Sequence, residues 1–167
     1  RDGQAAAVGS AASQAIDLLR GEAWQAGTYE VSTADGKNHR FEVSAIPEPL
    51  EIGGPWTVKF PPNLGAPGEV TMDQLASLSN HADPGVKFFS GTATYSRKIS
   101  VPKEMTGAKR RLYLDLGRAE VMARVKLNGK DLGLLWKPPY RLEITEAVKT
   151  GDNALEISVV NLLPNRM

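Results

Sequence analysis

The side chains best suited to chemistry in this sequence are aromatic and basic groups in one short segment. The run Leu134-Leu135-Trp136-Lys137-Pro138-Pro139-Tyr140-Arg141 places two large rings and a guanidinium at a predicted strand exit. Sugar recognition uses an aromatic face against the C–H side of the sugar, with polar groups on its hydroxyls. Trp136, Tyr140 and Arg141 are therefore candidate carbohydrate-binding residues. The alternative, which the sequence slightly favours, is that these rings close one end of a β-sandwich or dock onto a neighbouring domain.

The two histidines, His39 and His81, are the next groups that could take part in binding or catalysis. His81 lies in the predicted loop His81-Ala82-Asp83-Pro84-Gly85, where an imidazole near a carboxylate could extend the carbohydrate-binding surface. We therefore add His81 and Asp83 to the candidates, although a solvated loop is the more common outcome. His39 alternates with apolar residues of a predicted hairpin, which indicates a structural role.

No set of residues predicts a catalytic centre. The sequence has no nucleophile-elbow serine, no His–Glu pair at helical metal spacing and no glycine-rich phosphate loop. Glycoside hydrolysis needs two carboxylates held about 5–9.5 Å apart. The available acids, each in or beside a predicted strand, are Asp115, Glu120, Glu143 and Glu156. Outward charge on a strand normally faces water, so no catalytic residue is assigned.

Cofactor chemistry is similarly limited. Cysteine is absent, which excludes disulfides, thiolate metal sites and cysteine nucleophiles. A structural Ca²⁺ is compatible with a β-sandwich, but no dense acidic loop predicts its site, and Asp152 and Asn153 have the pattern of turn formers. We therefore assign no metal ligand and expect no cofactor.

Charge and hydropathy restrict the partners. The chain has 167 residues, with 20 Lys plus Arg against 19 Asp plus Glu, so its formal charge is +1. This balance gives no reason to expect nucleic acid or an anionic membrane as partner. No apolar run approaches the roughly 20 residues of a membrane helix. Because the chain starts at Arg1 and shows no signal-peptide pattern, we interpret it as a processed or excised piece of something longer.

Strands must position these residues, since alternating apolar residues are the dominant pattern. From Val121 to Leu127 apolar and polar residues alternate, which is typical of a strand with one buried face. Asn128-Gly129 then provides the two residues at positive φ that a tight hairpin turn needs. Similar alternation over 56–60, 89–101, 112–116 and 155–159, with Arg97 as an exception, predicts further strands.

Helical signals are few. A short helix is predicted over 11–19, with a frayed segment or a strand nearly as well supported. A capping-box spacing at Thr71-Met72-Asp73-Gln74, before Leu75 and Leu78, predicts another short helix. After residue 80 we expect only one helical turn, near Glu146–Lys149. Residues 1–50, with a hairpin over 28–43 and a linker at Pro47 and Pro49, form an N-terminal segment, and 51–167 form the main domain.

Short strands, frequent Gly, Pro and Asn turns and little helix predict an all-β fold. We expect an antiparallel β-sandwich or jelly roll with a small N-terminal extension.

An ordered series of short motifs also resembles a known domain. Its parts are Gly54-Pro55-Trp56, Phe89-Ser90-Gly91-Thr92-Ala93-Thr94-Tyr95, Asp115-Leu116-Gly117, Leu127-Asn128-Gly129, Leu132-Gly133, Trp136, Pro139-Tyr140, Ile144-Thr145, Gly151-Asp152-Asn153-Ala154-Leu155-Glu156-Ile157, Val160-Asn161 and Asn165-Arg166. The series resembles the galactose-binding-like β-sandwich of large glycoside hydrolases, and most closely the C-terminal part of α-L-rhamnosidase-type enzymes of family 106. Sugar-binding domains of the β-galactosidase and β-glucuronidase family are more distant.

The resemblance implies a sandwich attached to a catalytic barrel that supplies the hydrolytic carboxylates, so this chain alone would not be an enzyme. The implied function is a carbohydrate-binding or scaffolding module of a bacterial glycoside hydrolase acting on rhamnose-containing glycans. The implied partners are a glycan or monosaccharide and the catalytic domain, in an extracellular or periplasmic location. Two alternatives stay open: a stand-alone small glycosidase or polysaccharide lyase, and a purely structural domain that buttresses a barrel.

Overall fold

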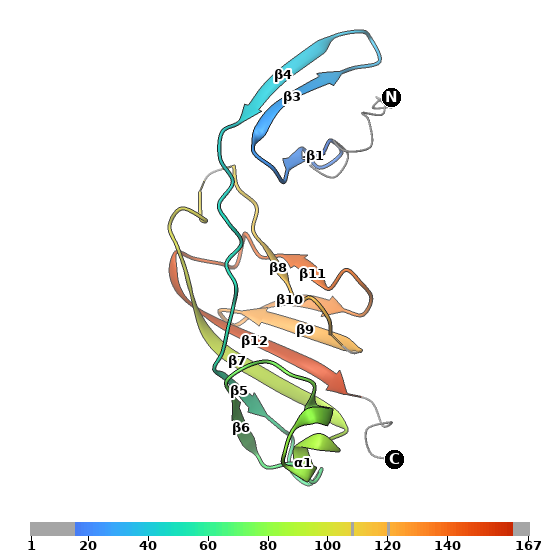
Figure 1. Ribbon diagram of the computed structural model, residues 1–167, viewed down its shortest axis with the longest axis vertical. Coiled ribbons are helices and arrows are strands. Elements are labelled where there is room, and N and C mark those ends of the chain that lie inside the picture. The colour runs from blue at the N-terminus through green and yellow to red at the C-terminus, as the bar shows by residue number, and fades with distance from the viewer. Residues whose placement is uncertain (1–15, 108, 120, 162–167) are drawn as a thin grey trace. The chain divides into compact units, whose positions relative to one another are not determined.

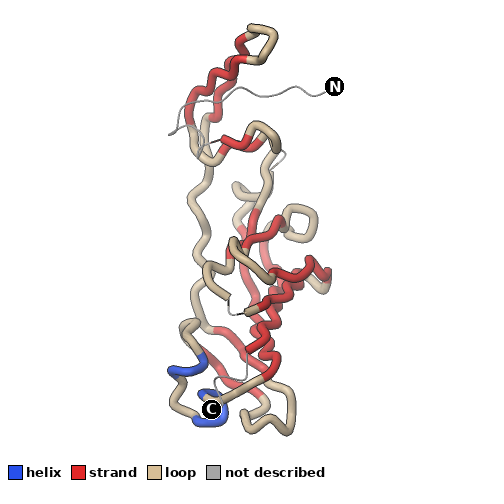
Figure 2. The backbone as a smooth tube through the Cα atoms, turned by 90° about the vertical axis from the view of Figure 1, so that its right-hand side faces the viewer, coloured by secondary structure: helices blue, strands red, loops and turns tan. Residues whose placement is uncertain are grey.

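The protein divides into two compact units, Arg1–Leu50 and Glu51–Met167, hereafter unit 1 and unit 2. The computed structural model describes residues 16–107, 109–119 and 121–161 (Figure 1). In these residues strands predominate, and helix is confined to one end of unit 2 (Figure 2). Each unit is described by itself below.

Unit 1 contains two short antiparallel hairpins. β1 (Ile16–Asp17) pairs with β2 (Glu22–Ala23), and β3 (Gly27–Ser32) pairs with β4 (Asn38–Val43). The helix predicted over 11–19 is wrong in its described part, because Ile16 and Asp17 are extended; residues 11–15 lie outside the described residues. The Asp17 carboxylate accepts the backbone N–H groups of Leu19 and Arg20, at 3.0 and 3.1 Å. Such a local bond offers the backbone a turn instead of a helix.

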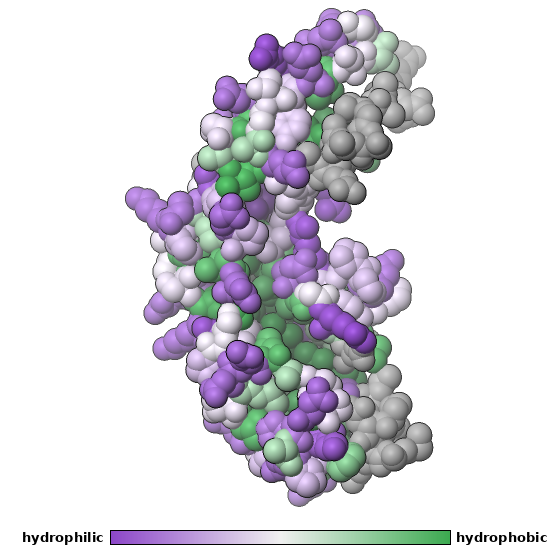
Figure 3. Space-filling model, viewed as in Figure 1, coloured by the Kyte–Doolittle hydropathy of each residue, from purple (hydrophilic) through white to green (hydrophobic). Residues whose placement is uncertain are grey.

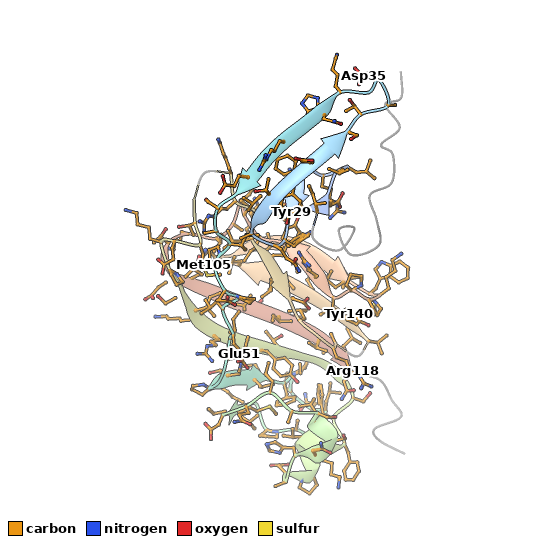
Figure 4. All side chains as sticks on the ribbon, turned by 45° about the horizontal axis from the view of Figure 1, so that its top comes forward. Tyr29, Asp35, Glu51, Met105, Arg118 and Tyr140 are labelled. Carbon is orange, nitrogen blue, oxygen red and sulfur yellow. The ribbon has the colours of Figure 1, made fainter. Side chains whose placement is uncertain are left out.

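The turn between β3 and β4 is held by its own side chains. Thr33 N–H donates to the Lys37 carbonyl at 2.8 Å, and Gly36 takes a positive φ of 81°. Asp35, at the tip of the hairpin (Figure 4), accepts a hydrogen bond from the Thr33 hydroxyl and lies 3.0 Å from Lys37 Nζ. The Thr33 hydrogen bond, followed by that of Lys37, lowers the pKa of the Asp35 carboxyl.

Unit 2 is built on a six-stranded antiparallel sheet with the strand order β10-β9-β12-β7-β5-β6. The strands are β5 (Trp56–Lys59), β6 (Glu69–Met72), β7 (Gly91–Val101), β9 (Met122–Leu127), β10 (Lys130–Leu135) and β12 (Gly151–Asn161). β7 and β12 pair along their whole length, from Gly151↔Val101 to Asn161↔Gly91. A second, two-stranded sheet pairs β8 (Tyr113–Asp115) with β11 (Arg141–Glu143).

The two sheets enclose the larger of two apolar clusters. Ala123, Val125 and Leu127 of β9, with Leu155 and Ile157 of β12, pack with residues from the second layer, among them Leu114 and Ile144. Side chains of alternating parity thus face a shared core, as two packed layers require. The predicted all-β, antiparallel sandwich is confirmed.

The smaller apolar cluster lies where β5, β6 and β7 meet the helical segment. Phe60 and Phe89 meet edge to face, with ring centroids 4.8 Å apart, and Val58 is fully buried beside them. The 3₁₀ helix η2 (Leu78–Asn80) contributes Leu78, and α1 (Pro84–Lys87) contributes Val86. A short irregular segment therefore covers the part of the sheet that the second layer does not.

The helix predictions need correction. The capping-box residues Thr71 and Met72 lie in β6, where Met72 faces the core opposite Trp56, so cross-strand burial overrides the local helix signal. The only helix near Leu75 in the described chain is the single turn η2. Conversely, α1 was not predicted, although Asp83 as N-cap and Pro84 at the first helical position form a recognised start signal.

Two asparagines fix the β9–β10 hairpin to the turn before β12. Asn128 takes a φ of 53° and Gly129 a φ of 82°, as the predicted two-residue turn requires. The Asn128 amide donates to the Ala147 carbonyl and to the Asn153 side-chain carbonyl, both at 2.8 Å. Asn153, only 2% exposed, donates to the carbonyls of Lys149 and Gly151. Its polar atoms are thus paired despite complete burial.

Candidate functional site

Trp136 is the aromatic candidate that presents its ring to solvent. It follows the last residue of β10, and its side chain is 62% exposed. Lys137 Nζ lies 5.1 Å from the ring centroid, within the range of a cation–π contact. The ring can stack on the apolar side of a sugar, and the neighbouring ammonium can donate to a hydroxyl or pair with a carboxylate.

Tyr140 and Arg141 are instead engaged in the sandwich. Tyr140 is partly buried against the larger cluster, its hydroxyl lies 3.4 Å from the Val121 carbonyl, and its own carbonyl accepts the Leu116 N–H at 2.8 Å. The Arg141 guanidinium lies 4.4 Å from the Tyr113 ring centroid. Both residues therefore contribute to the second layer, where Figure 4 marks Tyr140.

His81 and Asp83 have local structural contacts. Asp83 Oδ1 accepts the Gly85 N–H at 2.7 Å, which is the bond of an N-cap. His81 Nδ1 accepts the backbone N–H of Asp83 at 3.0 Å. This bond places the proton of a neutral imidazole on Nε2, which stays available to donate.

The structure does not bring the five candidates together. α1, which Asp83 caps, borders the smaller apolar cluster, whereas β11, which Arg141 begins, borders the larger one. Figure 1 shows α1 and β11 at opposite ends of unit 2. Trp136, Tyr140 and Arg141 share one connection between β10 and β11, and His81 and Asp83 belong to a separate location.

The carboxylates considered for catalysis have local partners. Asp115 accepts the Gly117 N–H at 2.8 Å, and Glu143 accepts the Thr145 hydroxyl at 2.8 Å. Glu156 lies 3.4 Å from Lys126 Nζ across the sheet. Glu120 lies outside the described residues. Within the described ranges, no group of three or more His, Cys, Asp or Glu side chains is placed to hold a metal ion.

Two polar groups on the inner face of the sheet were missed by sequence reasoning. The Arg97 guanidinium lies 5.9 Å from the Trp56 ring centroid. Arg97 Nη1 and Trp56 Nε1 are both buried without a hydrogen-bond partner among the described residues. The signal that could have found them is the inward parity of Arg97 within an otherwise apolar pattern, because β7 directs that position to the core.

The outer face of the six-stranded sheet carries a shallow hollow of about 510 Å³. Its polar lining residues come from four strands: Thr57 from β5, Ser96, Arg97 and Lys98 from β7, Lys126 from β9 and Glu156 from β12. Hydroxyl, ammonium and carboxylate groups alternate here, as expected for a sheet face turned to water. Two of these charged groups, the Lys126 ammonium and the Glu156 carboxylate, pair with each other at 3.4 Å.

The chain is similar to parts of much longer known proteins. No family model matches the sequence. A structure described as a rhamnosidase from Novosphingobium sp. PP1Y is 43% identical, with a TM-score of 0.66, over 75% of this chain and 12% of that one. A Formosa agariphila protein named "Putative beta-glucuronidase" is 43% identical over 141 residues, which are 84% of this chain and 12% of that protein.

A more distant structure shows a similar arrangement. A beta-glucuronidase of an uncultured Clostridium species is 25% identical, with a TM-score of 0.56, over 67% of this chain and 22% of that one. The chain therefore spans between about an eighth and a fifth of the proteins that it matches, and it corresponds to a single domain-sized part of each. In the part of the chain that the structure describes, no helix is long and apolar enough to cross a membrane.

Proposed function

We propose that this chain is a non-catalytic accessory domain of a larger glycoside hydrolase acting on rhamnose-containing glycans. The observation that carries the proposal is the 43% identity to the Novosphingobium rhamnosidase over three quarters of this chain and only 12% of that protein. The part we propose is the galactose-binding-like sandwich that the motif series resembles, without hydrolytic carboxylates of its own. The local partners of Asp115, Glu143 and Glu156 support this assignment.

Within this proposal, scaffolding is the main role. Tyr140 and Arg141 are used by the second layer. Asp83 caps α1, and His81 accepts the Asp83 N–H, so four of the five candidate binding residues have structural contacts. An accessory domain of this kind positions neighbouring parts of a long chain through its surface.

Activity measurements test the proposal. We expect the longer polypeptide that contains this chain to hydrolyse an aryl α-L-rhamnoside, and the 167-residue chain to leave it intact. Hydrolysis of an aryl β-glucuronide instead would assign the activity named for the Formosa protein. Turnover by the chain alone, lost when one carboxylate is replaced, would support the alternative of a small stand-alone glycosidase or lyase.

Carbohydrate binding is a second candidate role, favoured by the exposed ring of Trp136 and its neighbour Lys137. Calorimetry with rhamnose, glucuronate and rhamnose-containing oligosaccharides tests it. If Trp136 is the platform, Trp136→Ala should weaken binding by roughly five- to tenfold, since an aromatic contact contributes about 1 kcal/mol. Phe88→Ala is the matched control, because Phe88 is also exposed and has Lys87 Nζ 5.6 Å from its ring centroid. If none of these sugars gives a binding heat, scaffolding is the single role that remains.

A further inference from the structure

Unit 1 has no buried residue in its described part. Every residue from 16 to 50 is exposed or only half-buried, and all buried side chains of the described chain belong to unit 2. Several large apolar side chains are well exposed there, including Leu19 at 94% and Phe41 at 38%. Figure 3 shows apolar residues of this unit at the surface among polar ones. An isolated two-stranded hairpin is marginally stable at best, and residues 16–50 have no core of their own.

The hairpin β3–β4 is nevertheless clearly two-sided. The cross-strand pairs Tyr29↔Phe41 and Val31↔His39, with Val43, form one side, which we call the apolar hairpin face. Tyr29 and Phe41 stack there with centroids 5.4 Å apart. The opposite side carries only polar residues, namely Thr28, Glu30, Ser32, Asn38, Arg40 and Glu42. Alternation this strict specifies one buried and one solvated face.

The relatives contain a segment like unit 1 together with much further chain. Unit 2 contains 117 residues, since it runs from 51 to 167, whereas the match to the Formosa protein extends over 141 residues of this chain. At least 24 of the matched residues (141 minus 117) therefore belong to unit 1. Unit 1 is thus shared with a protein in which most of the sequence lies outside the match.

We infer that the apolar hairpin face docks onto an apolar surface of another domain of the longer polypeptide. This inference rests on the proposed function, which supplies that polypeptide. Burial of Val31, Phe41 and Val43 at such a contact provides the hydrophobic stabilisation that the hairpin lacks by itself. The polar face, with the Glu30↔Arg40 pair, stays in water. Unit 1 is then a docking element, joined to the sandwich by the Pro47 and Pro49 segment.

Hydrogen–deuterium exchange of backbone amides, measured by mass spectrometry, tests the inference. In the 167-residue chain, the amides of residues 28–43 should exchange almost as fast as in an unfolded peptide, while those of β7 and β12 stay protected. In the longer polypeptide the same hairpin amides should exchange at least about tenfold more slowly, because opening then requires undocking.

Two variants of the apolar hairpin face sharpen the measurement. Phe41→Ser and Val31→Thr should each restore fast hairpin exchange in the longer polypeptide. Val31→Thr keeps the branched side-chain shape and the strand propensity, and it replaces one methyl group with a hydroxyl. Arg40→Ser, on the opposite face beside Phe41, is the matched control and should leave the protection unchanged.

Four results would overturn the inference. The first is strong protection of the hairpin in the monomeric 167-residue chain. The second is protection that rises with concentration together with a dimer by light scattering, which would make the occupant a second copy. The third is fast exchange of the hairpin amides in the longer polypeptide. The fourth is an equal effect of Phe41→Ser and Arg40→Ser on those amides. Glycosidase activity, measured on the same sample, separately decides the proposed function.

Discussion

Asn153 is the residue whose environment departs most from its sequence pattern. Gly151-Asp152-Asn153 predicts an exposed turn, yet the Asn153 side chain is 2% exposed and makes hydrogen bonds to Asn128, Lys149 and Gly151. The turn prediction is wrong here, because these three residues begin β12 and pair with β7. The partner Asn128 is distant along the chain. Only the folded arrangement of β9 and β12 brings the two amides together.

Replacement of Asn153 should therefore be costly. We expect Asn153→Ala to lower the free energy of unfolding by roughly 2–4 kcal/mol, because several buried backbone groups and the Asn128 amide lose a partner. Urea denaturation followed by tryptophan fluorescence measures it. Asn80→Ala, an exposed asparagine of η2, is the control and should change stability by no more than about 0.5 kcal/mol. Equal losses for both variants would contradict the role of the network.

Tyr95 gives a pH-dependent prediction. Desolvation by burial raises the pKa of its phenol above the ordinary value of 10.0. The unfolded chain then loses this proton at lower pH than the folded chain, so the contribution of Tyr95 to stability is complete below about pH 10 and is lost as the pH rises through the folded pKa. The ultraviolet absorbance of tyrosinate, followed during a pH titration, should show one phenol that loses its proton at higher pH than an ordinary tyrosine. Tyr95→Phe should remove it and make stability less dependent on pH above about pH 10.

At the scale of elements, four strands of unit 2 follow from alternation, whereas β6 and the helices do not. Apolar residues of one parity predicted β5, β7, β9 and β12 correctly, since a buried sheet face imposes a period of two. α1 spans four residues, too few for a helical period to be visible. The capping-box signal at 71–74 failed because Met72 gains more by facing the core from β6.

The approach of β5 to the end of β6 depends on a glycine. A Cβ on Gly54 would lie 1.5 Å from the Asp73 carbonyl oxygen, which is backbone and cannot move aside. We expect Gly54→Ala to destabilise unit 2 by about 3 kcal/mol or more, the upper range for overpacking. Gly53→Ala is the adjacent control, because a Cβ there meets nothing within 4 Å, and it should stay within about 1 kcal/mol of wild type. Thermal unfolding of the two variants measures both changes in stability. Similar losses of stability for Gly54→Ala and Gly53→Ala would contradict the role of this contact.

At the scale of the whole molecule, the distribution of buried residues predicts that unit 2 folds without unit 1. A chain of residues 51–167 should unfold cooperatively in urea, with the same midpoint and slope as the 167-residue chain. The reason is that every buried side chain of the described residues lies in unit 2, and the slope reports the surface exposed on unfolding. Circular dichroism measures both quantities. A lower midpoint for the shorter chain would show that unit 1 stabilises unit 2.

The sequence specified the fold far better than a binding site. The motif series indicated a similarity to parts of large glycoside hydrolases, and the chain is similar to parts of proteins described as a rhamnosidase and a beta-glucuronidase. Turns and strand parity carry most of the information about a sandwich. The candidate site depended on where connections place their side chains. Trp136 and Tyr140 differ by four positions, yet one ring is 62% exposed and the other packs against the core. Nothing local to those residues determines that difference.

The irregularity in β10 has a consequence for solubility. β10 is an outer strand of the six-stranded sheet, and its register to β9 shifts between Asp131 and Gly133. There the Gly133 N–H is taken by the Asp131 carboxylate at 2.9 Å, and Arg124 lies 3.2 Å from the same carboxylate. A strand of another molecule that approached this edge would meet an irregular backbone, where bulges increase the twist of a strand. The Gly133 N–H is already hydrogen-bonded there, and the charged side chains of Arg124 and Asp131 lie beside it. The bulge thereby protects an open edge, flanked by the exposed Leu134, from recruitment into aggregates.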